Sequence, residues 1–171
     1  MKTNIIKIQH YVSPCGGLRL GEFEGKLCLC NWTEEKHPGR VDKRLQHRLA
    51  ATYIEETSDL LQEAIRELDE YFRGERQQFA LPLLFVGTDF QKQVWQQLLT
   101  IPYGQTISYG EMARQLGCPT SVRAVANANG ANAISLFAPC HRVIGSNGSL
   151  TGFGGGIEAK KYLLALEARC R

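Results

Sequence analysis

A cysteine and a histidine stand side by side in the stretch "LFAPCHRVIGSNGSLTGFGGG", which covers residues 136–156. The thiol of Cys140 becomes a strong nucleophile only as a thiolate, which a neighbouring base or positive charge favours. His141 could supply that base, but adjacent residues on an extended strand point to opposite faces. The two side chains can therefore cooperate only if the chain bends here, and Pro139 restricts the backbone in a way that favours a fixed turn.

Taken alone, a Cys-His pair is more often structural than catalytic, with the cysteine a small buried residue. The glycines that follow bear on this choice. The sequence "VIGSNGSLTGF" predicts a hairpin with Asn147 and Gly148 at its turn, and "GFGGG" leaves the next segment without side chains. A bare backbone can approach a flat ligand closely, but a flexible linker has the same composition, so both interpretations stay open.

The elements before residue 88 predict a small α/β unit. Apolar and polar positions alternate from residue 4 to residue 32, which predicts three short strands in an antiparallel sheet. A helical pattern follows from Val41 to Arg73, and Gly74 ends it. Residues 75–87 show no clean period and contain a proline, so they predict an extended connection and a boundary between domains 1–87 and 88–171. The predicted strands are residues 5–12, 18–23 and 27–32.

The second part reads as helices separated by tight turns. Thr88 and Gln91 form a capping-box pattern at the start of one predicted helix, and Ser108 and Glu111 repeat it at the start of another. After a short turn, residues 121–130 are compatible with a further helix. Two helices joined in this way have the spacing of a helix-turn-helix.

The last of these helices has few groups that could read a base sequence. Its only long polar side chain is Arg123, and most of the other positions are Ala or Val. A helix in the major groove usually displays several long donors and acceptors to base edges. A thin helix, one whose surface side chains are small, could approach the minor groove instead and offer one arginine to the duplex whatever the base sequence. The alternative is that Ala and Val simply pack inside the domain, and both can hold on different faces.

Composition sets the outer limits of these interpretations. With 171 residues, 43% of them hydrophobic, the chain can form one large domain or two small ones. The N-terminus lacks the apolar run of a signal peptide or a membrane span, so an intracellular protein is expected. Six cysteines without CxxC pairs disfavour a disulfide scaffold and a finger-type zinc site. Residues 1–87 carry a net charge of −1 and residues 88–171 carry +4, which suits an anionic partner.

The box "PCHRV" resembles one family closely when its surroundings are included. It is preceded by "SYGEMA", "RAV" and "NGAN" and followed by "GSNGSLTGFGGG" and "KKYLLALE". Together these residues resemble the O6-alkylguanine-DNA alkyltransferases, also called methylated-DNA-protein-cysteine methyltransferases. The resemblance runs from about Thr88 to Glu167, and the N-terminal part matches only in outline. It implies an α/β protein with a ribonuclease-H-like N-terminal domain and a winged-helix-like C-terminal domain that carries the helix-turn-helix.

The resemblance implies a suicidal DNA repair protein that acts once. Such a protein transfers the alkyl group of O6-alkylguanine irreversibly to its own cysteine, which here would be Cys140. His141 would act through a bound water as general base, and Glu167 would orient it. Asn132 would order the bend between the helix-turn-helix and the active-site loop. The reaction needs no cofactor.

The resemblance also implies how the substrate is held. Tyr109 would donate a hydrogen bond to the guanine, and Arg123 would replace the extruded base in the stack. Phe153 and Gly154 would belong to one wall of the guanine pocket. The expected partner is double-stranded DNA containing O6-methylguanine, or O4-methylthymine, bound in the minor groove without sequence preference. A monomer is expected, with no membrane contact, in the cytoplasm, on the nucleoid or in a nucleus.

Several positions depart from the family pattern, and one metal site needs consideration. Affinity for DNA and the range of accepted alkyl groups depend on these departures, whereas the reaction type does not. The departures are Ala126, Ala133, Ala138 and Phe153. Some members of the family hold a structural zinc in the N-terminal domain, but the spacing of the candidate ligands here does not match, so no zinc is predicted. These candidates are His10, Cys15, Cys28, Cys30 and His37.

Three rival functions can be weighed against the alkyltransferase. Alkyltransferase-like binding modules lack the acceptor cysteine, whereas this chain has Cys140. A multi-turnover cysteine hydrolase would need an oxyanion hole and a path for water to its adduct. A sensor that activates transcription after alkylation would carry an extra metal-binding module, for which these 171 residues offer no counterpart.

Overall fold

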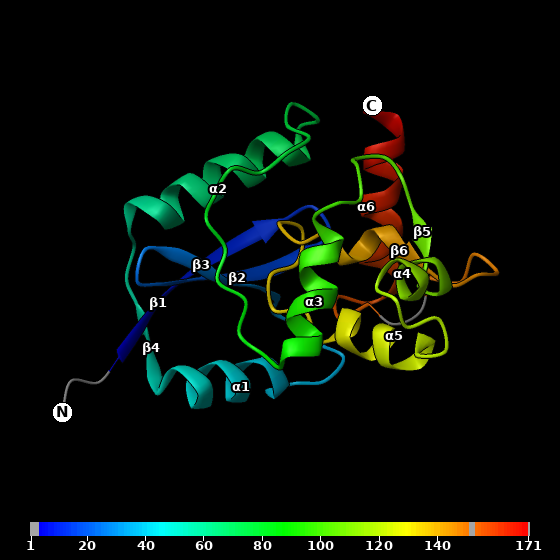
Figure 1. Cartoon of the computed structure of the whole chain (residues 1–171). Coiled ribbons are helices and arrows are strands. Elements are labelled where there is room, and N and C mark those ends of the chain that lie inside the picture. The colour runs from blue at the N-terminus through cyan, green and yellow to red at the C-terminus, as the bar shows by residue number, and fades with distance from the viewer. Residues whose placement is uncertain (1–3, 151–152, 171) are drawn as a thin grey trace.

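A four-stranded sheet forms the centre of the N-terminal part (Figure 1). The computed structural model describes residues 4–150 and 153–170. Strands β1 (Asn4–Ser13), β2 (Gly16–Phe23) and β3 (Lys26–Trp32) form an antiparallel meander, as the alternating pattern predicts. A fourth strand, β4 (Ala51–Glu55), pairs in parallel with β1, so the sheet is mixed and has the order β3-β2-β1-β4.

The prediction of one helical pattern from Val41 to Arg73 is wrong in its middle. The structure divides this stretch into helix α1 (Arg40–Leu49), strand β4 and helix α2 (Asp59–Phe72). Ala50 ends α1 in a left-handed conformation with φ of 48°. The next residues are "TYI", which favour an extended chain, and five residues of strand are too few to interrupt a helical pattern visibly.

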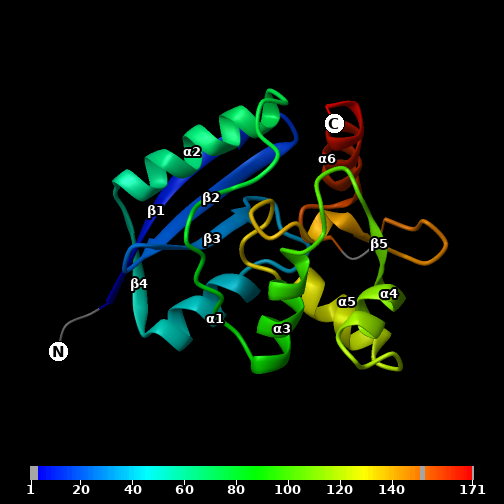
Figure 2. The same ribbon diagram turned by 45° about the horizontal axis from the view of Figure 1, so that its top comes forward.

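The two helices lie on opposite sides of the sheet in both views (Figures 1 and 2). Helix α2 begins at Ser58, whose side chain accepts a hydrogen bond from the Leu61 backbone at 3.1 Å. Three members of its apolar stripe, Leu61, Ala64 and Leu68, are fully buried. Gly74 follows in a left-handed conformation, which confirms it as the end of this helix.

The extended connection after α2 covers the outer edge of the sheet. The backbone N–H of Leu27 in β3 donates to the carbonyl of Pro82 at 2.9 Å, and Leu84 N–H donates to the Leu27 carbonyl at 2.9 Å. Bonds of this kind satisfy an edge strand that would otherwise be open to pairing. No helix in residues 4–150 and 153–170 combines the length and the apolar character needed to span a bilayer.

The C-terminal part is mostly helical, as predicted. Its helices are α3 (Asp89–Leu98), α4 (Tyr109–Gln115), α5 (Val122–Gly130) and α6 (Ile157–Arg169). The side chains of Thr88 and Gln91 form both halves of a capping box at the start of α3, and Ser108 accepts from the Glu111 backbone at the start of α4. These contacts confirm the predicted helix starts.

The predicted hairpin after the Cys-His pair falls partly within the described residues. A turn does occur at Asn147 and Gly148, where Gly148 has φ of 81°, and Gly145 N–H donates to the Ser149 carbonyl across it at 2.8 Å. Strand β6 (Val143–Ile144) pairs in parallel with β5 (Ile107–Ser108). Residues 151–152 of the predicted hairpin lie outside the described residues.

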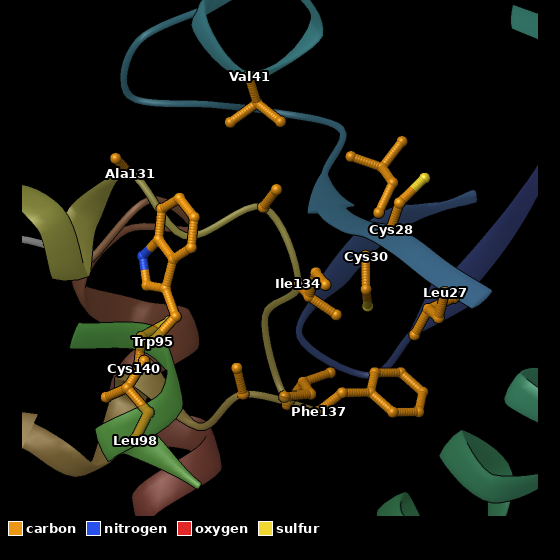
Figure 3. Close-up of a cluster of buried hydrophobic side chains, with 14 of the residues drawn as sticks. Leu27, Cys28, Cys30, Val41, Trp95, Leu98, Ala131, Ile134, Phe137 and Cys140 are labelled. Carbon is orange, nitrogen blue, oxygen red and sulfur yellow. The ribbon is translucent and has the colours of Figure 1, made fainter. Parts of the chain in front are cut away.

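Strand β3 joins the two parts through the loop that leads to the Cys-His pair. Cys30 N–H donates to the Ala133 carbonyl at 2.8 Å, and its carbonyl accepts from Ser135 N–H at 2.8 Å. Figure 3 shows Cys28, Cys30 and Ile134 within one buried cluster. Both strand cysteines are fully buried and serve as core residues. In the described part of the chain, no three His, Cys, Asp or Glu side chains are grouped closely enough to hold a metal ion.

Candidate active site

The backbone bends at the Cys-His pair, as the argument from Pro139 predicts. Cys140 to Arg142 form a single turn of 3-10 helix, closed by a 3.0 Å hydrogen bond from Arg142 N–H to the Pro139 carbonyl. Just upstream, Leu136 is buried and has a left-handed φ of 73°. A buried leucine rarely adopts this conformation, so the surrounding contacts must enforce the shape of the loop.

Asn132 supplies the contacts that fix this loop. Its side-chain Nδ2 donates to the Ala138 carbonyl at 2.9 Å, and its Oδ1 accepts from Ile134 N–H at 3.0 Å. Asn129, in the last turn of α5, donates from Nδ2 to the Cys140 carbonyl at 3.2 Å. The end of the helix-turn-helix and the cysteine are therefore held together by two asparagines, of which the sequence pointed to Asn132 alone.

Cys140 is 3% exposed and lines a small cavity of about 20 Å³, which has room for one water molecule. Burial raises the pKa of the Cys140 thiol, although hydrogen bonds with Asn132 and Ser135 and the charge of Lys160 oppose this shift. The thiol therefore stays protonated near neutral pH and needs a base to become a thiolate. The cavity is lined from the N-terminal part by Asn31, Glu35, Lys36, His37, Arg40 and Val41, and from the C-terminal part by Asn129, Gly130, Asn132, Ser135, Cys140 and Gly154.

The carboxylate of Glu167 is the centre of a buried hydrogen-bond network. His141 Nε2 lies 2.6 Å from its Oε2, and both residues are almost completely buried. Arg142 donates from Nε to Oε1 at 2.8 Å and from Nη2 to Oε2 at 3.0 Å. Gly104 N–H adds a bond to Oε1 at 3.2 Å, and the Tyr71 hydroxyl donates to Oε2 at 2.6 Å. The resemblance gave Glu167 the role of orienting His141, and the structure buries its carboxylate fully among these donors.

This network determines which nitrogen of His141 carries the proton. Burial alone would raise the pKa of Glu167, but hydrogen bonds from His141 and Arg142 lower it well below its usual range. An ionised carboxylate only accepts hydrogen bonds, so His141 must donate from Nε2. Burial also lowers the pKa of His141, against the pull of Glu167, so the ring is neutral at pH 7. Its Nδ1 then carries a lone pair, and this buried atom has no hydrogen-bond partner within residues 4–150 and 153–170.

A buried lysine that the sequence did not indicate lies near the thiol. Lys160 is fully buried, and its Nζ donates to the Val143 carbonyl at 2.6 Å. Its ammonium lies 5.7 Å from the ring centroid of Tyr109 and 6.0 Å from that of Phe153. Burial lowers the pKa of Lys160 to about 8, and the neighbouring Cys140 acts against that shift. A positive charge here favours the thiolate form of Cys140.

The glycine-rich segment is shaped by packing against β3. Phe153 is buried and meets Trp32 edge to face, with 5.7 Å between the ring centroids. A Cβ atom on Gly155 would lie 2.5 Å from the Trp32 ring, so this position must be bare, whereas one on Gly154 would meet only the Gly130 carbonyl at 3.8 Å. Gly154 lines the Cys140 cavity, and its place in the wall of a guanine pocket stays a prediction. The Phe153 ring is directed to Trp32, and its role toward a base stays a prediction.

Helix α5 has one face on the protein and one on solvent. Val125 and Ala128 are buried, while Arg123, Ala124 and Asn127 are exposed. One face of the helix therefore packs inside, as one interpretation of its Ala and Val residues predicted, while the approach of the exposed face to a minor groove stays a prediction. Among the departures from the family pattern, Ala126 is half-buried on this helix and Ala133 and Ala138 act through their backbone carbonyls.

Two family models together match nearly the whole chain. The 6-O-methylguanine DNA methyltransferase ribonuclease-like domain matches residues 6–85, and the DNA binding domain of the same family matches residues 89–169. This chain belongs to the 6-O-methylguanine DNA methyltransferase family. The assignment confirms the predicted family and α/β fold class.

Relatives with this family's name occur in bacteria and archaea. A methylated-DNA–protein-cysteine methyltransferase of Methanosarcina acetivorans is 49% identical over 94% of this chain and 97% of its own length. The Mycobacterium leprae protein of the same name is 56% identical over 61% of this chain, and the chain spans 64% of that relative's length. The crystal structure of Mycobacterium tuberculosis O6-methylguanine methyltransferase aligns with a TM-score of 0.82 and 41% identity, covering 97% of this chain and 94% of that one.

Tyr71 connects the N-terminal part to the hydrogen-bond network around Glu167, and removal of its hydroxyl should change the pKa of His141. The Tyr71→Phe variant removes one of the donors to Oε2 of Glu167, which leaves more negative charge to attract an imidazolium. We expect the pKa of His141 to rise and the free energy of unfolding to fall by about 1.5–3 kcal/mol. Tyr11→Phe is the control, because it removes a similar tyrosine–carboxylate bond to the same helix, to Asp69 at 2.7 Å, without removing a donor to Glu167. If NMR titration gives equal pKa values of His141 in the two variants, the proposed influence of Tyr71 on His141 through Glu167 is contradicted.

Proposed function

We propose that this chain repairs DNA by transferring an alkyl group from the O6 atom of guanine to Sγ of Cys140, in a single turnover. The observation that carries the proposal is the bond between His141 Nε2 and Glu167, which leaves Nδ1 as the unpartnered basic nitrogen of the residue that follows the buried Cys140. Family membership and the exposed thin face of α5 next to the thiol loop support it. No cofactor takes part in this chemistry.

The reaction is a displacement at carbon. A water held between Nδ1 of His141 and the thiol passes the thiol proton to the imidazole, and Glu167 stabilises the imidazolium that results. The thiolate attacks the alkyl carbon, so an S–C bond forms while the O6–C bond breaks. The electron pair remains on guanine O6, and Tyr109 favours this leaving group by donating a hydrogen bond to the base. The thioether product has no free thiol, which ends the activity of that molecule.

Recognition uses shape and charge rather than base edges. Helix α5 enters the minor groove, Arg123 fills the gap in the stack, and the alkylated guanine rotates into the pocket lined by Gly154. The cavity of about 20 Å³ is too small for a base, so loop 33–39 and the glycine-rich segment must separate to admit it. O6-methylguanine is the main substrate proposed, and O4-methylthymine is a second. A monomer located in the cytoplasm or at the nucleoid stays part of the proposal.

The intact mass of the protein tests the proposed reaction. After incubation with duplex DNA that contains O6-methylguanine, we expect each chain to gain one methyl group, carried by the peptide that includes Cys140. The Cys140→Ala variant should gain none, while Cys118→Ala, which removes a half-buried thiol elsewhere, should react as the wild type does. A wild-type protein that keeps its mass would overturn the proposal, and repeated release of methylated product would favour a hydrolase.

The pH dependence of transfer tests the role of His141. Because burial lowers the pKa of His141 below 6.5, the imidazole remains a base at pH values where an exposed histidine is already half protonated. We expect the single-turnover rate to stay constant from about pH 7 to about pH 6.5, where Lys160 with its pKa of about 8 remains charged, and to decline only below that range. A rate that is already halved at pH 6.5 would show that His141 titrates normally and would remove the support that burial gives to this mechanism.

A further inference from the structure

Positive charge gathers on one short segment of the N-terminal part. Residues 36–48 hold five Lys or Arg and a single Asp, although residues 1–87 as a whole carry a net charge of −1. That residue, Asp42, is already bound by Arg19 at 2.8 Å and by the Tyr53 hydroxyl at 2.7 Å. On α1 the basic residues recur at spacings of three and four, so they share one side of the helix. We call this set the α1 basic stripe, and it consists of Arg40, Lys43, Arg44, His47 and Arg48.

The helix-turn-helix itself has little charge of its own. Residues 88–132 hold three Lys or Arg against two acidic residues, and Arg114 is paired with Glu111. Binding to duplex DNA without sequence preference depends on cations that neutralise phosphates and release counterions. Arg123 is required in the base stack by the proposed function, so further phosphate contacts must come from elsewhere on the surface.

Two hydrogen bonds place the α1 basic stripe next to α5. Arg40 donates from Nη2 to the Gly130 carbonyl at 2.9 Å, and Arg44 donates from Nη2 to the Ala131 carbonyl at 2.7 Å. These carbonyls lie at the C-terminal end of α5, where the helix dipole favours positive charge. Burial lowers the pKa of Arg44 to about 10, so it remains charged at neutral pH. In both views α1 and α5 lie along the same edge of the molecule (Figures 1 and 2).

The rest of the stripe is open to solvent. Lys43, His47 and Arg48 are exposed. Ten residues of α-helix extend about 15 Å, which corresponds to roughly four base pairs of duplex at 3.4 Å each. The stripe therefore begins beside the C-terminal end of α5 and extends over the length of about four base pairs.

We propose that the α1 basic stripe is a second DNA-binding surface, which contacts backbone phosphates of the duplex beyond the C-terminal end of α5. This proposal rests on the proposed function, because α5 makes the first contact with the DNA. Arg40 and Arg44 fix the position of the stripe, and Lys43 with its exposed neighbours meets the phosphates. The contact reads no sequence, which suits a protein that must examine any duplex.

Lys43 is the residue on which to test the proposal, because it is exposed and does not line the Cys140 cavity. Binding of Lys43→Gln and Lys43→Glu to an unmodified duplex is measured by fluorescence anisotropy over a range of salt concentrations. For Lys43→Gln we expect the negative slope of log K against log salt to become less steep by about 0.9 and binding to weaken about fivefold at about 0.15 M salt. Lys43→Glu should weaken binding further.

Lys26→Gln and Lys26→Glu are the matched controls, since Lys26 is an exposed lysine at the start of β3. Both should bind nearly as the wild type does, and thermal unfolding should show that all four variants are folded. An unchanged salt slope in the Lys43 variants, or an equal loss of DNA binding in the Lys26 variants, would overturn the proposal of a second DNA-binding surface. If the Lys43 variants show the expected change in salt slope but the wild-type protein gains no methyl group, the proposed function alone would be contradicted.

Discussion

The hydrogen bond between the Glu167 carboxylate and His141 Nε2 is the interaction on which the site depends. It fixes the tautomer and orientation of a ring that has no contact with solvent, and it leaves Nδ1 as the basic nitrogen. A buried carboxylate is costly unless its charge is compensated, and Arg142 provides that compensation through two bonds. Arg142 directly follows His141 in sequence, so the turn after Pro139 positions both donors to Glu167 together.

The N-terminal part contributes to the site as well as supporting it. Tyr71, from α2, completes the shell of donors around Glu167, and β3 pairs with the loop that Asn132 shapes. Arg40 and Arg44 bind the carbonyls at the end of α5. Helix α2, strand β3 and helix α1 thus contact three pieces of the machinery: the carboxylate that orients the base, the nucleophile loop and the helix that is proposed to bind DNA.

Sequence patterns predicted what depends on local chemistry. Alternation gave β1 to β3, the side chain of Thr88 gave the start of α3, and Pro139 gave the bend, because each depends on residues close in the chain. Strand β4 was missed because five residues between two helices leave no period to detect. Tyr71 and Lys160 were missed because they reach the site from distant positions and look like ordinary helix residues. The family resemblance identified Glu167, whose burial no local pattern could reveal.

The most direct test of this account is the protonation state of His141 in the free protein. Nitrogen NMR of protein labelled in its histidine rings at pH 7 reports whether each ring nitrogen carries a proton. The account predicts a neutral ring with the proton on Nε2 and none on Nδ1. A ring protonated on both nitrogens, or one that carries its proton on Nδ1, would contradict the claim that Glu167 prepares His141 to accept the thiol proton.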